Sequence, residues 1–428
     1  MKKILLLLTL LIVYGLSFSQ SSQKDAPVKV ELRFVDSSYQ LLRNGLPYFV
    51  KGAGGSSYPD RLKSYGGNSI RTWGTKGAEK VLDSAQKYGL TVLLGLDVAR
   101  ERHGFNYDDT AAVQKQLNAL KAEVIKFRNH PALLAWGIGN ELNLSYKNSK
   151  VWDAVADISK MIHQLDPNHP TTTVLAGVSK QVVSFIKEKC SDLDFLSVNT
   201  YGDLASLPRT LENVGWAGAY LVTEWGPTGH WEGLETEWKQ PIEESSSEKA
   251  AVYKSRYEYS IERDRKKCLG SYVFLWGQKQ ERTPTWYGLF TERGVESEVV
   301  DVMQYLWTGT WPKNKAPHIY SFQLDSKKAS TNVYVQAGKK YDALAIVTDP
   351  DGDKLSYRWE LLPEPVKVSE GGDFEARSKS LEGLIAAGET GKSRITAPSK
   401  PGAYRLFVYI TDVDNNIATA NIPFYVKD

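Results

Sequence analysis

Short apolar runs alternate with amphipathic segments from about residue 48 to residue 309. Eight of the runs have the length and composition of buried strands. The segments between them place apolar residues at three- and four-residue spacing, as Ile158, Ile162 and Leu165 do, which is typical of helices that cover a sheet. This alternation predicts parallel strands with right-handed crossovers, and eight units favour a closed (β/α)8 TIM barrel, an α/β fold. The predicted strands are residues 48–52, 69–73, 91–97, 132–139, 171–176, 195–199, 219–224 and 271–276.

The chain on either side of this region has a different pattern. Residues 30–47 alternate like strands and contain Asn44-Gly45, a strong turn signal, so a short β-hairpin is expected before the barrel. The stretch around 308–317 is rich in Gly, Pro and Lys, which predicts a linker at 310–317. Residues 318–428 contain short strand-like runs separated by turn residues. We therefore expect a barrel over residues 21–309 and an immunoglobulin-like β-sandwich over residues 318–428.

The first twenty residues have the features of a signal peptide. Lys2 and Lys3 precede an apolar stretch at 4–13, small residues follow, and cleavage is expected near Ser19 or Gln20. A secreted or periplasmic protein is therefore expected, without a lipid anchor, since no cysteine lies at that junction. Because no later segment has about 18 consecutive apolar residues, no integral membrane segment is expected after cleavage.

Charge and cysteine content narrow the chemistry. The net charge is +3, too small to indicate a nucleic-acid partner. Cys190 and Cys268 precede strands that would not be neighbours in a barrel, which favours two buried thiols over a disulfide. No Cys or His lies near them at ligand spacing, so no metal is expected, and no organic cofactor either. The acidic stretch 349–353 has its glycine in fourth rather than sixth place, which favours a tight turn over a calcium loop.

Polar and aromatic residues follow the apolar runs where the predicted strands end. Reactive groups of a TIM barrel lie at these carboxyl ends. Two glutamates, Glu141 and Glu224, follow the fourth and seventh strands. A lone glutamate there is usually a rim charge, but two that face each other suit glycoside hydrolysis. One carboxyl protonates the leaving oxygen, and the other attacks the anomeric carbon or activates water.

The residues around both glutamates resemble glycoside hydrolase clan A. Residues 139–142 (Gly-Asn-Glu-Leu) look like the acid/base signature of the clan, and residues 222–226 (Val-Thr-Glu-Trp-Gly) like its nucleophile motif. Segments 44–52, 68–71 and 194–202 are also similar to the clan, and the resemblance spans about residues 40–309. Full family 2 enzymes carry β-sandwich domains before the barrel, whereas the expected sandwich follows it here. Family 2-like and family 5-like barrels therefore both stay open.

This resemblance implies a retaining β-glycoside hydrolase acting on a β-linked oligo- or polysaccharide. Glu141 would be the acid/base and Glu224 the nucleophile, with Asn140 on the sugar 2-hydroxyl and Trp276 as the floor of the subsite. A transglycosylase that uses the same covalent intermediate stays open, and so does a non-catalytic glycan-binding surface protein, although both glutamates are present. The expected substrate-binding residues are Arg71, Trp73, Asn140, Asn199, Tyr201, Trp225 and Trp276.

Two further segments are candidates for the walls of a cleft. The stretch 226–247 is long for a barrel loop and contains His230, Trp231 and Trp238, so it is either a cleft wall or a surface insertion. Trp286 and Tyr287 follow the eighth strand and would extend the cleft on that side.

Overall fold

The computed structural model describes residues 27–428 except residues 367, 370, 371, 387 and 389. The predicted signal peptide, residues 1–20, lies outside the described residues. Within the described residues, no helix combines the length and the apolar character needed to cross a bilayer.

Eight parallel strands form a closed barrel in which the last strand pairs with the first. Most strand residues are buried, because helices cover the outer face while side chains fill the interior. The strands are β4 (Val50–Gly54), β5 (Ser69–Arg71), β6 (Thr91–Leu96), β7 (Leu133–Ile138), β8 (Thr171–Ala176), β9 (Phe195–Asn199), β10 (Tyr220–Trp225) and β11 (Cys268–Val273). The predicted TIM barrel is therefore confirmed.

Helices and short helical turns connect successive barrel strands. The α-helices are α1 (Pro59–Ser64), α2 (Ala78–Tyr88), α3 (Thr110–Phe127), α4 (Lys150–Leu165), α5 (Lys180–Lys189), α6 (Leu207–Asn213), α7 (Ser246–Arg256) and α8 (Glu298–Thr308). The short turns are η1 (Glu101–His103), η2 (Gly202–Ser206) and η3 (Tyr257–Ile261). Each predicted strand has its counterpart. The last strand begins at Cys268 rather than at residue 271, because Cys268 already pairs with Tyr220 of β10.

A small antiparallel sheet precedes the barrel. It contains β1 (Val30–Val35), β2 (Ser38–Arg43) and β3 (Leu46–Pro47). Asn44 and Gly45, with φ angles of 52° and 75°, form the turn between β2 and β3. Both angles lie in the left-handed region that the predicted hairpin turn requires.

The C-terminal region is a sandwich of two sheets, as predicted. One sheet has the order β13-β15-β17, and the other contains β16, β18, β19 and β14. Between the sheets lies a separate apolar core that includes Leu324, Leu361 and Phe424. The strands are β13 (His318–Leu324), β14 (Val333–Gln336), β15 (Lys340–Thr348), β16 (Ser356–Pro363), β17 (Lys392–Thr396), β18 (Gly402–Thr411) and β19 (Asn416–Lys427), with the turn η4 (Ala329–Thr331).

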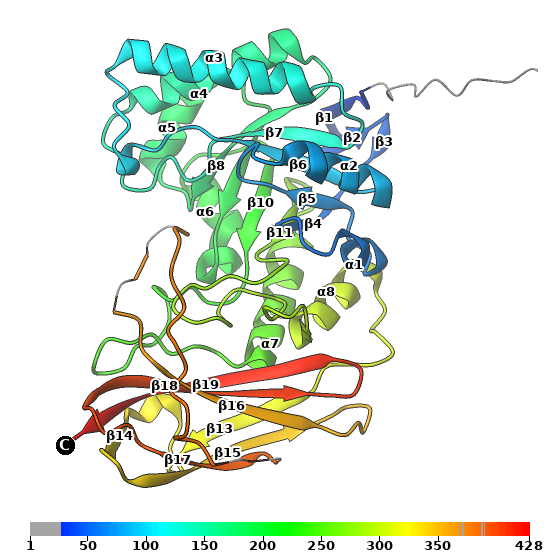
Figure 1. Cartoon of the computed structure of the whole chain (residues 1–428). Helices are drawn as coiled ribbons and strands as arrows, with labels where there is room; N and C mark the ends of the chain where they lie inside the picture. Colours follow the sequence, from blue (N-terminus) through cyan, green and yellow to red (C-terminus); the bar gives the residue numbers. More distant parts are fainter. Residues whose placement is uncertain (1–26, 367, 370–371, 387, 389) are drawn as a thin grey trace, which may run out of the picture.

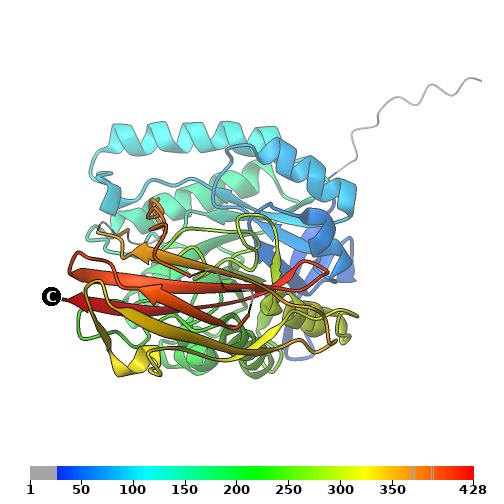
Figure 2. The ribbon, with the colours of Figure 1, turned by 60° about the horizontal axis from the view of Figure 1, so that its bottom comes forward.

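The sandwich packs directly against the barrel. The short strand β12 (Glu296–Ser297), which precedes α8, extends the sandwich sheet by pairing with β19. The Ser246 and Ser247 hydroxyls at the start of α7 accept hydrogen bonds from Thr419 N and Ile319 N of the sandwich. In Figure 1 the β10 arrow points toward the sandwich, and Figure 2 shows the long β18–β19 pair lying across the barrel. The sandwich therefore lies at the carboxyl ends of the barrel strands.

Both cysteines are free thiols. Cys190 and Cys268 are buried, and burial raises the pKa of each thiol to about 12. Both thiols are therefore protonated at neutral pH and poorly reactive.

Candidate active site

A cavity of about 1080 Å³ opens at the carboxyl ends of the barrel strands. Glu141 and Glu224 both line it, together with Trp73, Asn140 and Asn199. Segments far apart in the sequence meet here because parallel barrel strands all end on one face. The cavity is large enough for a sugar ring and parts of its neighbours.

Glu224 lies near the end of β10, where three side chains donate hydrogen bonds to its carboxylate. Arg71 Nη1 and Trp73 Nε1 donate to Oε1 at 2.8 and 2.6 Å, and the Tyr201 hydroxyl donates to Oε2 at 3.0 Å. Burial and the nearby Glu224 charge raise the pKa of Tyr201 well above its ordinary value, so the phenol keeps its proton and donates. These donors hold the carboxylate in one orientation.

Arg71 connects this carboxylate to the rest of the site. Its side chain is buried and forms an ion pair with Glu224. The guanidinium also donates to Asn140 Oδ1 at 2.6 Å and to the Thr223 carbonyl at 2.7 Å. A buried cation is stable only with such partners. Asn199 completes the cluster by donating to Asn140 Oδ1 at 3.1 Å.

Glu141 has a different setting from Glu224. Its backbone adopts φ 55°, uncommon for a residue with a side chain, and its N–H donates to the Val174 carbonyl on β8. Among the described residues, the hydrogen bond to its carboxyl comes from Asn199 Nδ2 at 3.0 Å. Burial and, next, the charge of Glu224 raise the pKa of Glu141 to about 7. Glu141 can therefore hold a proton at neutral pH.

The structure thus brings seven of the expected site residues into one cluster. Six of them line the cavity and the seventh, Arg71, contacts the Glu224 carboxylate, whereas the other two expected residues, both aromatic, lie outside the cluster. The clustered residues are Arg71, Trp73, Asn140, Glu141, Asn199, Tyr201 and Glu224.

The predictions for Trp225 and Trp276 as substrate-binding residues are wrong. Trp225 is fully buried and packs on Tyr253 and Tyr257, because side chains alternate along a strand and Glu224 takes the inward position. Trp276 is also fully buried. It packs against Phe290 and Trp307 and cannot form the floor of a subsite.

Phe274 lines the cavity where Trp276 was expected. Its ring meets Trp73 and Tyr201 edge-on at centroid distances of 5.8 and 6.1 Å. A weak signal for it was available in the sequence, since Phe274 directly follows β11. The predicted strand was continued too far, to residue 276.

The long segment after β10 forms part of the cavity wall. His230 and Trp231 line the cavity, which favours the wall interpretation over a surface insertion. Trp238 instead packs on Tyr334 and Tyr425 of the sandwich.

Residues after β11 form another wall, which sequence analysis foresaw only in part. Of the two aromatic candidates there, Tyr287 lines the cavity and Trp286 does not. Lys279, Glu281 and Arg282 line it as well, and the sequence analysis missed them. Sandwich residues were missed entirely, because only the packing of the two domains brings them to the barrel mouth. They are Pro365, Val366, Val368, Gly372 and Asp373.

The acidic stretch 349–353 lies in the sandwich and forms a tight turn. Asp349 Oδ1 accepts hydrogen bonds from Asp351 N and Asp353 N at 2.9 and 3.0 Å. Asp349, Asp353 and Asp412 form a carboxylate group of a size that could hold a cation, and none of them lines the cavity.

Comparison with known proteins agrees with the barrel fold. Residues 60–255 match the family model described as the TIM barrel domain of glycosyl hydrolases family 2. Mannan endo-1,4-beta-mannosidase F of Aspergillus clavatus is 27% identical over 187 residues, covering 32% of this chain and 43% of that protein. Beta-glucuronidase of Chlorocebus aethiops is 23% identical over 206 residues, covering 43% of this chain and 31% of that protein.

Solved structures show the same fold. Bacteroides uniformis beta-glucuronidase 2, covalently bound to cyclophellitol-6-carboxylate aziridine, superposes with a TM-score of 0.51 at 15% identity. The alignment covers 93% of this chain and 48% of that chain. This chain therefore spans less than half the length of these relatives. The family-model match confirms the resemblance of the barrel to glycoside hydrolase clan A, in its family 2-like form.

Proposed function

We propose that this chain, whose barrel resembles that of clan A, is a retaining β-glycosidase. It would cleave a β-linked oligo- or polysaccharide by double displacement. The observation that carries the proposal is the pair of carboxyls in one cavity with opposite settings. Glu224 accepts three hydrogen bonds from positioned donors, whereas Glu141 has its pKa raised to about 7. Such a split between two acids matches the nucleophile and acid/base roles of glycoside hydrolysis.

In the first half of the reaction, Glu224 attacks the anomeric carbon and forms a covalent glycosyl-enzyme. Arg71, Trp73 and Tyr201 fix the direction of attack by holding both carboxylate oxygens. Glu141 donates its proton to the departing glycosidic oxygen, so that the leaving group departs as an alcohol.

In the second half, Glu141 acts as a base. Glu224 is neutral once it is bonded to sugar, so the repulsion that raised the pKa of Glu141 is relieved. Glu141 then removes a proton from water, which attacks the anomeric carbon and releases Glu224. We expect Asn140 to contact the sugar 2-hydroxyl and the rings of Trp73 and Phe274, which also line the cavity, to pack on the sugar.

We also propose that the protein is exported. This rests on the charged residues Lys2 and Lys3 and the apolar stretch that follows them. Mass spectrometry of the mature protein from its source would test it, with a new N-terminus near residue 20 as the expected result.

Azide rescue tests the catalytic assignment. Glu224→Ala should lose nearly all turnover of 4-nitrophenyl β-glycosides, and azide should restore it and yield the α-glycosyl azide. Glu141→Ala with the same substrates should yield the β-glycosyl azide, because the covalent intermediate still forms. Glu212→Ala, at an exposed ion pair of α6, is the control and should behave like wild type. A folded Glu224→Ala variant that azide does not rescue would contradict the nucleophile assignment.

A further inference from the structure

A segment of the sandwich reaches across the mouth of the barrel. We name residues 372–375, which follow β16, the sandwich strap. Near one end, the Gly372 carbonyl accepts a hydrogen bond from Lys279 Nζ at 3.0 Å, and Lys279 follows β11. Asp373 also meets His103 of η1, after β6, at 3.3 Å. Figure 1 shows this part of the chain, in orange, rising from the sandwich toward the barrel loops.

The barrel order shows which arc the strap spans. The ring runs β11, β4, β5, β6, so the shorter arc between the two loops that the strap contacts, after β11 and after β6, contains the ends of β4 and β5. Gly372 and Asp373 also line the cavity that holds Glu141 and Glu224. The strap therefore forms one side of the active-site cavity.

A buried carboxylate fixes the strap in this position. Glu375 is 5% exposed and accepts hydrogen bonds from Arg282 N at 2.7 Å, Ser369 N at 3.3 Å and Gln280 Nε2 at 3.4 Å. A buried carboxylate bound in this way does not exchange readily with water. Glu375 therefore anchors the strap to the loop after β11.

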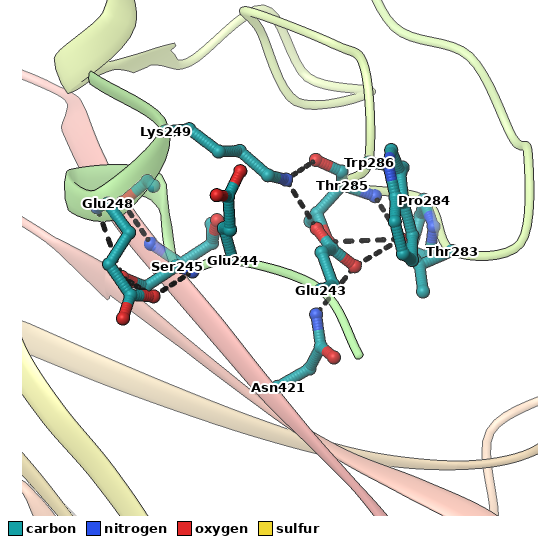
Figure 3. A network of polar contacts seen from close by, with 12 residues as sticks. Glu243, Glu244, Ser245, Glu248, Lys249, Thr283, Pro284, Thr285, Trp286 and Asn421 are labelled. Atoms are coloured by element: carbon teal, nitrogen blue, oxygen red, sulfur yellow. Dashed lines mark hydrogen bonds and ion pairs between the residues drawn. The ribbon is translucent and has the colours of Figure 1, made fainter. Parts of the chain in front are cut away.

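The barrel segment that holds the strap is fixed in turn. Figure 3 shows buried Glu243 accepting hydrogen bonds from Thr283 and Thr285, which lie within three residues of Arg282, and from Asn421 of β19. Lys249 of α7 pairs with the same carboxylate at 2.5 Å. Hydrogen bonds thus connect the strap, the loop after β11 and the sandwich sheet to one another.

The opposite side of the cavity is open. Leu144, Ala176 and Gly177 line it there, after β7 and β8. The connection from β8 to α5 is short, and a Cβ atom placed on Gly177 would meet nothing within 4 Å. Glu141 lies on this side, as the third residue after the end of β7.

We propose that the enzyme is exo-acting and that the sandwich strap ends the cavity on the glycone side, so that one terminal sugar is removed per cleavage. This rests on the proposed function. Glu141 must face the leaving oxygen, so the leaving group extends over the open rim beyond β7 and β8. The sugar attacked by Glu224 then points toward the arc covered by the strap, which leaves no path for a preceding sugar.

Paired substrates test this proposal. We take the 4-nitrophenyl β-monoglycoside that wild type cleaves fastest and the matching β-1,4-linked 4-nitrophenyl diglycoside. Wild type should release free monosaccharide first from the diglycoside, with 4-nitrophenol appearing only after a lag. Immediate release of 4-nitrophenol together with an intact disaccharide would overturn the proposal. Absence of any aryl glycoside cleavage, and of azide rescue, would instead count against the β-glycosidase function.

Strap variants then test the cause. Glu375→Ala removes the anchor and Asp373→Ala removes the contact with His103, and at least one should raise direct disaccharide release about tenfold while monoglycoside turnover persists. The milder Asp373→Ala variant covers the case in which Glu375→Ala fails to fold. Tyr320→Ala, on exposed β13 away from the cavity, is the matched control and should leave the product ratio unchanged. Unchanged ratios in both folded strap variants would contradict the role of the strap.

Discussion

Two clusters of buried acidic residues in this protein differ in how well their carboxyls are hydrogen-bonded. In the barrel–sandwich interface, Glu243 accepts hydrogen bonds from Lys249, Thr283, Thr285 and Asn421 (Figure 3). In the active-site cavity, Glu141 accepts one from Asn199 within the described part of the chain. Burial alone would raise both pKa values. The Lys249 charge and its hydrogen bond nevertheless lower the pKa of Glu243, whereas the pKa of Glu141 rises to about 7.

This difference separates an acid that stabilises the fold from one that can do chemistry. A buried carboxylate that accepts several hydrogen bonds and pairs with a cation stays ionised at neutral pH. A buried carboxyl beside a second negative charge takes one up at neutral pH and can give it away again. The two clusters should therefore respond in opposite ways to the same kind of substitution.

The largest effect is expected for Glu141→Gln. We expect kcat/KM to fall about 10²- to 10⁴-fold on alkyl β-glycosides, which need a proton on the leaving oxygen. The loss should be much smaller on 4-nitrophenyl glycosides, whose leaving group departs without protonation. Thermal stability should be unchanged or higher, because a neutral amide is easier to bury. A loss of activity that does not depend on the leaving group would contradict the acid role.

Glu243→Ala should show the reverse pattern. Removing one partner of a buried ion pair leaves Lys249 unpaired, and such changes cost about 3 to 5 kcal/mol of unfolding free energy. Thermal and urea unfolding followed by circular dichroism would measure the loss. Glu237→Ala is the control, because Glu237 contacts Tyr334 across the same interface but is exposed, and it should cost less than about 1 kcal/mol.

The two clusters also differ in how far sequence alone could predict them. Apolar strands that end in polar residues identified Glu141, Glu224 and Arg71, because strand ends in a barrel share one face whatever the details of packing. The interface cluster joins Glu243 to Asn421, and no local pattern connects residues of two separately predicted domains. The errors at Trp225 and Trp276 have another physical cause. Their orientation depends on side-chain alternation and on where a strand ends, and strand ends are poorly defined by sequence.

The pH dependence of catalysis gives a sharper test of the Glu141 setting. Because the acid must be protonated, and its pKa is raised to about 7, kcat/KM on alkyl glycosides should decline about tenfold per pH unit above 7. Glu141→Gln should remove this decline in kcat/KM above pH 7. If the decline persisted in the variant, it would have to arise from another titrating group. An unchanged wild-type rate up to pH 9 would contradict the raised pKa.

Asp301 on α8 offers the smallest expected effect and the strictest test of the comparison. It is buried outside the cavity and accepts a hydrogen bond from Ala316 N at 2.7 Å, and burial raises its pKa to about 7. The folded state therefore binds more protons than the unfolded chain between about pH 4 and pH 7, so its contribution to stability falls as pH rises through that window. Asp301→Asn should leave activity unchanged and stabilise the fold by about 1 kcal/mol at pH 8, with no gain at pH 4. Unfolding curves at the two pH values would measure this. Loss of activity in Asp301→Asn would contradict this expectation. It would mean that a buried acid with a raised pKa can matter for activity even outside the cavity.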